Sequence, residues 1–241
     1  MRLYFVRHGE SENNELYRRT GSDEGRSHDP KLTDIGWKQA QATANFLATH
    51  RDPVGDMDET NYGITHVYSS LMVRALSTAS VIGQRLGVKV IPWKDWHENG
   101  GIYLDDRTTN QKIGLPGLCL EEIRENFPDV ILDESIPENG WWDRPYEERE
   151  ERPVRARRVL YELLDRHGGT DDRVLVVSHG GFYMNFLAAV LGVEEIVIAW
   201  FQLNNCGITR IDFMDGDRRI VYHNFLCHLS DRAEVMNNIF S

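Results

Sequence analysis

The chain has 241 residues, of which 41% are hydrophobic, so it is long enough to bury a substantial core. Its 38 acidic residues outnumber the 27 basic ones and give a net charge of −11. Because nucleic acids and anionic membranes are bound through clustered Lys and Arg, this balance argues against both as partners. The three cysteines, which lie far apart, fit neither a disulfide framework nor a zinc site, so we expect a reducing cytoplasm.

The first elements alternate between strand and helix. Residues 2–7 form a short apolar run typical of a buried strand, and a polar loop is expected from there to about residue 31. The run at 3–6 is too short for a signal peptide. Thr33 is the predicted N-cap of a helix with apolar residues at helical spacing. Residues 64–69 predict a second strand, Ser70 the start of a helix, and residues 88–91 a third strand.

Residues 93–153 break this alternation. They contain turns and a short helix around 120–127, and we interpret them as an insertion that covers the active site within a single domain of residues 1–241. Four further groups of elements are expected after the insertion: a charged helix at 153–167, a strand at 174–178, a helix at 182–191, and two late strands at 196–203 and 207–213. The arginines at 152–158 stand next to glutamates at 147, 148, 150 and 151, which predicts a solvated, salt-bridged helix face.

One stretch has the length of a membrane span. Residues 174–193 carry no charge, but polar side chains and two glycines interrupt the first half of the stretch. We interpret this stretch as a buried strand, a glycine turn and a helix, and we expect a soluble protein. Strands and helices that alternate in this way predict a three-layer α/β/α sandwich with a mostly parallel central sheet.

Five reactive side chains follow the predicted strands. Arg7 and His8 lie where the first strand ends, and His179 lies where the strand at 174–178 ends. Arg74 is in the first turn of the helix after the second strand, and Glu98 follows the third strand by a short loop. Because ligands of such folds bind at the carboxyl ends of the strands, we expect all five to line one site.

This set of side chains suits a phosphate dianion. The guanidinium groups of Arg7 and Arg74 can bind its oxygens in pairs, and free amides at the helix starts near Ser70 and Gly180 would add positive dipoles. A neutral His8 would be the nucleophile, since neighbouring arginines lower the pKa of an imidazole. Glu98 would protonate the leaving oxygen and then deprotonate the attacking water.

Several segments resemble one family. They are RLYFVRHGESENN (2–14), LTDIGWKQA (32–40), VYSSLMVRALSTA (67–79), VLVVSHGG (174–181) and NNCGITRIDF (204–213). Together they resemble the histidine phosphatase superfamily, also called phosphoglycerate-mutase-like, in the branch with an Arg-His-Gly-Glu motif after the first strand. The resemblance implies the phosphoglycerate-mutase-like fold and a phosphohistidine intermediate. It also implies that neither a metal nor an organic cofactor is needed.

The resemblance assigns a role to each matching residue. It implies that His8 is phosphorylated and that Glu98 is the proton donor. The phosphate pocket that it implies consists of Arg7, Asn14, Arg74, His179 and Gly180. Asn14 is equally compatible with capping a loop, and Glu10 and Glu121 are rivals of Glu98 as the acid.

Other residues fit a chemical role less well. Trp141, Trp142 and Tyr146 either line a substrate entrance or pack the insertion. The spacing of His223, Cys227 and His228 lacks a metal-ligand pattern, and we expect no metal site there.

The sequence therefore predicts a cytoplasmic, metal-independent phosphomonoesterase that acts on a small phosphorylated molecule. The first alternative is a phosphoglycerate mutase; the second is a non-catalytic protein that binds phosphorylated ligands. Family mutases follow the acid with a basic stretch for the substrate carboxylate, whereas this chain has Asp105 and Asp106, followed by Arg107. Apolar residues such as Ile239 and Phe240 are compatible with a homodimer.

Overall fold

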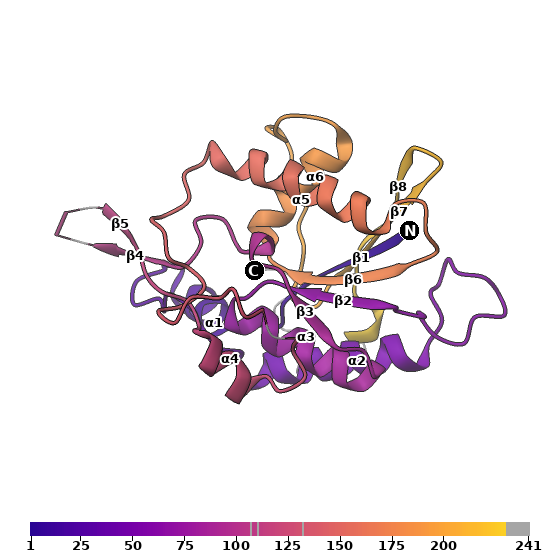
Figure 1. Cartoon of the computed structure of the whole chain (residues 1–241), viewed down its shortest axis with the longest axis horizontal. Coiled ribbons are helices and arrows are strands. Elements are labelled where there is room, and N and C mark those ends of the chain that lie inside the picture. The colour runs from indigo at the N-terminus through magenta and orange to yellow at the C-terminus, as the bar shows by residue number, and fades with distance from the viewer. Residues whose placement is uncertain (107, 110, 132, 230–241) are drawn as a thin grey trace.

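The computed structural model describes residues 1–106, 108–109, 111–131 and 133–229. Within them a central six-stranded sheet has the strand order β3-β2-β6-β1-β7-β8 (Figure 1). Its strands are β1 (Arg2–Arg7), β2 (His66–Ser69), β3 (Val90–Pro92), β6 (Arg173–Ser178), β7 (Ile208–Met214) and β8 (Asp217–Phe225). Strands β3, β2, β6 and β1 pair in parallel, and β7 and β8 add an antiparallel edge.

Helices cover both faces of this sheet, which confirms the predicted three-layer sandwich. Helices α2 (Asp34–Thr49) and α3 (Val73–Leu86) lie below it in Figure 1, and α5 (Glu151–His167) and α6 (Gly180–Leu191) lie above it. Strand β6 contributes to the cores on both faces of the sheet, because successive side chains of a strand point to opposite faces. Leu175 and Val177 belong to the core with α3, whereas Val174 and Val176 belong to the core with α5 and α6.

Two glycines bring the start of α2 against the loop after β1. A side chain on Gly9 would lie 2.5 Å from the carbonyl oxygen of Gly36, and one on Gly36 would lie 2.1 Å from that of Glu10. Thr33 caps α2 as predicted, because its hydroxyl accepts a hydrogen bond from the Gly36 amide at 3.0 Å. This contact fixes the loop that carries His8.

The loop expected up to residue 31 contains a helix, α1 (Glu12–Thr20). It has no buried residue, so its sequence carries no apolar periodicity from which a helix could be predicted. Its start is set instead by a capping box in which Ser11 and Asn14 exchange side-chain and backbone hydrogen bonds.

Residues 93–153 contain little regular structure. They form the short helix η1 (Lys94–Trp96), the hairpin of β4 (Tyr103–Asp106) and β5 (Gln111–Gly114), which projects from the body in Figure 1, and α4 (Leu120–Asn126). Trp141 and Trp142 are buried in the core below the sheet, which supports packing rather than a substrate entrance for these two rings.

The strand predicted at 196–203 is wrong. Val197, Ile198 and Trp200 have 79%, 100% and 68% of their surface exposed, so this apolar run lies outside the sheet. The run at 207–213 does form β7, which pairs with β1 on one side and with β8 on the other. The charged start of β8, Asp217 to Arg219, does not resemble a buried strand.

Within the described ranges no helix combines the length and the apolar character that crossing a membrane requires. Residues 174–193 instead contain strand β6 and helix α6, as expected. Three residues used in the sequence analysis lie outside the residues that the structure describes: Arg107, named for the mutase alternative, and Ile239 and Phe240, named for the homodimer.

Candidate active site

His8 lies directly after β1 and is 3% exposed. Its Nδ1 is 2.7 Å from the carbonyl oxygen of Gly9, and its Nε2 is 3.1 Å from Nε of Arg74, which can only donate. Nδ1 therefore carries the proton and Nε2 the lone pair. Burial, and then the charges of Arg74 and Arg7, hold the pKa of His8 well below its ordinary value. The imidazole is thus neutral and has a nucleophilic nitrogen.

A second buried imidazole lies beside it. His179, at the end of β6, has its ring centroid 5.1 Å from that of His8, and its Nε2 is 2.9 Å from the hydroxyl of Ser70. Its Nδ1 is buried and has no hydrogen-bond partner among the described residues. Burial, followed by the charge of Arg74, lowers the pKa of His179 well below its ordinary value. A neutral His179 can donate one hydrogen bond to a phosphate oxygen.

Arg74 lies in the first turn of α3 and is held by a carboxylate that sequence reasoning missed. Its Nη1 lies 3.7 Å from Oδ1 of Asp29, and the same oxygen accepts a hydrogen bond from the Val73 amide at 3.1 Å. Burial raises the pKa of Asp29 to about 7, although Arg74 opposes the shift. Asp29 precedes a proline in the loop before α2, and only this position in a turn hinted at a fixed side chain.

Arg7 and Asn14 complete the side of the site next to α1. Nη1 of Arg7 donates to the carbonyl oxygen of Leu203 at 2.7 Å, while its buried Nε has no partner among the described residues. The Oδ1 atom of Asn14 accepts from the Ser11 amide at 3.1 Å and from the Asn205 amide group at 3.3 Å. Asn14 therefore caps α1 and also lines the pocket described below.

Glu98 lies in the loop after η1 and reaches across to α6. Its carboxylate accepts hydrogen bonds from the backbone amides of Asn99 at 2.7 Å, Gly181 at 3.1 Å and Phe182 at 2.7 Å. A side chain on Gly181 would lie 2.6 Å from Oε1 of Glu98, which explains the glycine at this position. The three hydrogen bonds fix the carboxylate relative to the sheet.

The loop of Glu98 is also held from α5. Arg155 is 2% exposed and forms a two-point ion pair with the fully buried Glu147. Its Nη1 also donates to the carbonyl oxygens of Asp95 at 2.7 Å and His97 at 2.9 Å. The prediction of a solvated face at 152–158 is therefore wrong for Arg155, whose role is to position this loop.

These side chains enclose a small pocket with a volume of about 200 Å³. Five of the predicted site residues line it: Arg7, His8, Asn14, Arg74 and Glu98. His179 lies behind them against His8, and Gly180 begins α6 next to it. We refer to this cavity as the phosphate pocket, because the arginines and the neutral His8 that line it suit a phosphate dianion.

The free amides expected at the helix starts are mostly occupied. Those of Gly181 and Phe182 bind Glu98, and the Val73 amide binds Asp29. The Met72 amide donates to the Ser70 hydroxyl at 3.2 Å. Nearby acceptors therefore use four of the donors that a phosphate was expected to find.

The two alternative candidates for the proton donor, Glu10 and Glu121, lie outside the phosphate pocket. Glu10 is 1% exposed and accepts a hydrogen bond from the Thr33 hydroxyl at 2.8 Å, so it joins the loop after β1 to α2. Glu121 is exposed in the first turn of α4 and does not line the pocket. The geometry therefore favours Glu98.

Sequence reasoning missed a third arginine at the pocket. Arg26 stacks on the ring of Tyr103 at 4.3 Å, and both line the phosphate pocket. Its buried Nη1 has no partner among the described residues. The charge of Arg26 also lowers the pKa of Arg74, after burial and against two carboxylates. Arg26 belongs to a polar loop without periodicity, so its neighbours in the fold were not predictable.

One cluster of possible metal ligands occurs in the described part of the chain. His66, His167 and Asp172 have one ligand atom each within 4.8 Å of one another. They lie near the amino ends of β2 and β6, at the opposite end of these strands from His179. His167 already bonds to Asp172 at 2.9 Å and to Tyr68 at 2.9 Å, so hydrogen bonds account for its position.

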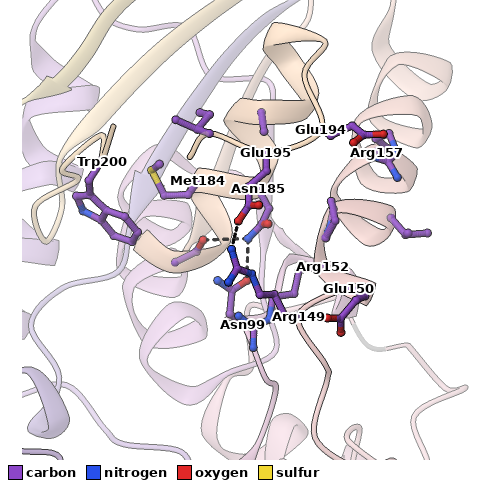
Figure 2. Close-up of a pocket in the computed structure, with 15 residues that line it drawn as sticks. Asn99, Arg149, Glu150, Arg152, Arg157, Met184, Asn185, Glu194, Glu195 and Trp200 are labelled. Atoms are coloured by element: carbon purple, nitrogen blue, oxygen red, sulfur yellow. Dashed lines mark hydrogen bonds and ion pairs between the residues drawn. The ribbon is translucent and has the colours of Figure 1, made fainter. Parts of the chain in front are cut away.

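Beside the phosphate pocket lies a larger cleft, shown in Figure 2. It has a volume of about 660 Å³ and is lined by the start of α5, one side of α6 and residues 194–200. We call it the α5–α6 cleft. Asn99 lines both the cleft and the phosphate pocket.

The comparisons with known proteins agree with this geometry. The model of the histidine phosphatase superfamily (branch 1) matches residues 3–226. A protein assigned as phosphoserine phosphatase 2 of Hydrogenobacter thermophilus is 28% identical over 236 residues, covering 94% of this chain and 97% of its own length. A protein assigned as phosphoglycerate mutase GpmB of Proteus mirabilis is 29% identical over 218 residues, covering 90% of this chain and 86% of its own.

A solved structure extends the comparison to the fold. Phosphoserine phosphatase of Entamoeba histolytica, in complex with 3-phosphoglyceric acid, superposes with a TM-score of 0.60 and 21% sequence identity. The match covers 95% of this chain and 98% of the other. At this identity the match shows a shared fold and no more.

Proposed function

This chain belongs to the histidine phosphatase superfamily (branch 1), and from that premise we propose that it is a metal-independent phosphomonoesterase with a phosphohistidine intermediate on His8. The observation that carries the proposal is the protonation pattern of His8. Its Nδ1 proton is held by the Gly9 carbonyl oxygen, so Nε2 keeps its lone pair, which accepts a hydrogen bond from Arg74 at the phosphate pocket. A nucleophile that needs no separate base suits this chemistry.

In the first step Nε2 of His8 attacks phosphorus. The N–P bond forms while the P–O bond to the alcohol breaks, and Glu98 gives its proton to the leaving oxygen. Arg7, Arg74 and His179 bind the three equatorial oxygens, whose charge they stabilise in the transition state. Since Arg74 donates to His8 in the structure, the arriving phosphate replaces this contact with one to its own oxygen.

In the second step water attacks the phosphohistidine. Glu98, now a carboxylate, takes the proton of the water, a P–O bond forms, and the N–P bond breaks to return neutral His8 and inorganic phosphate. The proposed ligand is a small phosphorylated molecule, in keeping with a pocket of about 200 Å³.

The test is phosphate release with EDTA present, from a panel of sugar phosphates, nucleotides, phosphoglycerates, phosphoserine and an aryl phosphate. We expect release by the native chain and none by the His8→Ala variant. Acid-labile phosphate should remain on the native protein when the reaction is quenched with base. Activity that EDTA abolishes and that Mg²⁺ or Zn²⁺ restores would contradict the proposal.

One observation favours the second candidate, a phosphoglycerate mutase. The argument against a carboxylate-bearing substrate rested on Asp105 and Asp106, but neither lines the pocket. Asp106 instead binds the amide of Thr108 and the hydroxyl of Thr109, both at 2.8 Å. Arg26 supplies a guanidinium in the pocket that a carboxylate could bind. Conversion of 3-phosphoglycerate to 2-phosphoglycerate without phosphate release would favour the mutase.

A further inference from the structure

The α5–α6 cleft lies on the side of the phosphate pocket where the proton donor is held. The Gly181 amide, which binds Glu98, belongs to a residue that lines the cleft. The amide group of Asn185 donates to Oδ1 of Asn99 at 3.1 Å, and Figure 2 shows both side chains in the cleft. The two cavities therefore meet at Asn99, next to Glu98. An alcohol whose oxygen is protonated by Glu98 leaves beside this junction.

The charges around the cleft are balanced. Three arginines and three glutamates line it: Arg149, Arg152, Arg157, Glu150, Glu194 and Glu195. Arg149 and Glu195 form an ion pair across the cleft in which 72% and 50% of the side chains are exposed. Exposed pairs of this kind contribute little to stability and exchange partners readily. A balanced lining gives no net attraction for a second anion.

Such a lining suits a ligand that both donates and accepts hydrogen bonds. Guanidinium groups only donate and carboxylates only accept, and the two amide side chains of Asn99 and Asn185 do both. A sugar offers a hydroxyl, which is both donor and acceptor, on most of its carbons. A nucleobase offers far fewer such groups, along one edge, and leaves charged side chains without partners.

The cleft also offers an apolar surface. Trp200 lines it with 68% of its surface exposed, and the apolar side chains of Met184 and Ile196 also line it. An indole face packs well against the C–H face of a sugar ring, while its N–H remains available for a hydroxyl. An exposed tryptophan in a concave site is otherwise costly to leave in water.

We propose that the alcohol half of the substrate is a sugar that occupies the α5–α6 cleft and stacks on Trp200. This inference rests on the proposed function, because it places the phosphate of the same molecule on His8. The substrate class is then a sugar phosphate whose ester oxygen lies beside Glu98 and whose ring extends past Asn99.

The test compares the specificity constants of pentose and hexose phosphates with that of phosphoserine. In the Trp200→Ala variant we expect the ratio of kcat/KM for the best sugar phosphate to that for phosphoserine to fall about tenfold, through KM. Trp200→Phe should restore most of the ratio. The matched control is Trp37→Ala, since Trp37 is 46% exposed on α2 and lines neither cavity. The control should keep the native ratio.

A binding measurement separates this inference from the proposed function. Calorimetry on the His8→Ala variant should show tighter binding of the sugar phosphate than of inorganic phosphate, with the gain lost when Trp200→Ala is added. Equal loss for every ester, an unchanged ratio, or a gain with nucleotides alone would overturn the sugar assignment while phosphate release stands. If the native chain releases phosphate from no ester but the calorimetric gain appears, the proposed hydrolysis fails and the sugar site stands.

Discussion

The phosphate pocket and the α5–α6 cleft lie on two sides of Asn99 and are built in opposite ways. His8, Arg74 and His179 are 3%, 8% and 0% exposed, and each follows a strand or begins a helix. The cleft is lined by long side chains such as Arg149 and Trp200, which are largely exposed. Buried groups fixed by the sheet suit chemistry that tolerates little displacement, whereas exposed side chains can be exchanged at small cost.

From this contrast we expect substitutions in the two regions to affect activity in different ways. A change to a side chain that binds the phosphate or reacts with it should lower the turnover of every ester, because all of them share the phosphate. A change in the cleft should alter the preference among esters and leave the fold intact.

The largest effect is expected for His8→Ala. Loss of the nucleophile should lower kcat by at least about a thousandfold for every ester, as removal of a covalent catalyst does elsewhere. Calorimetric melting would show whether the fold is retained. A variant that kept a tenth of the native turnover would contradict the phosphohistidine intermediate.

The second-largest loss of activity is expected for Glu98→Gln. We expect a loss of about a hundredfold to ten-thousandfold for alkyl esters, whose leaving oxygen needs a proton, and a smaller loss for a nitrophenyl ester, whose leaving group does not. The measurement is kcat/KM for both ester classes. Equal losses for the two would indicate that Glu98 holds the loop and does not act as the acid.

Arg26→Gln should have an intermediate and selective effect. The phosphate remains bound by Arg7 and Arg74, so we expect KM to rise about tenfold for phosphoglycerate and little for a neutral ester. Arg19→Gln on the exposed side of α1 is the matched control. A uniform rise in KM for all esters would show that Arg26 binds the phosphate itself.

The smallest effect on activity is expected for Asp29→Asn, which instead reports on pH. Burial raises the pKa of Asp29 from 3.8 to about 7, so between these values the folded state binds more protons than the unfolded state. The stabilisation is complete below about pH 4 and is lost as the pH rises through about 7. In the Asp29→Asn variant the free energy of unfolding should fall less steeply with pH over this range, by on the order of 1 kcal/mol per pH unit. Denaturant unfolding across this range measures it, and identical curves for both proteins would contradict the shift.

The sequence predicted the parts of the site that follow the sheet. His8 and His179 come directly after apolar strands, and Arg74 lies in the first turn of the helix that follows another, so the topology alone brought them together. Arg26 and Asp29 belong to a loop without periodicity, and nothing in the spacing showed that it folds back over Arg74. Helix α1 was missed for a related reason, since none of its residues is buried. The strand predicted at 196–203 failed because an exposed apolar run has the same composition as a buried one.

The hydrogen bonds from Gly181 and Phe182 to Glu98 have a consequence for how the enzyme can be altered. They fasten the carboxylate to the helix that follows His179, and β6, which ends directly before His179, pairs with β1, which ends directly before His8. The acid and the nucleophile are therefore held in register by one pair of neighbouring strands. Exposed side chains of the cleft such as Trp200 can change without moving either group, so the preference among esters can evolve while the reaction stays the same.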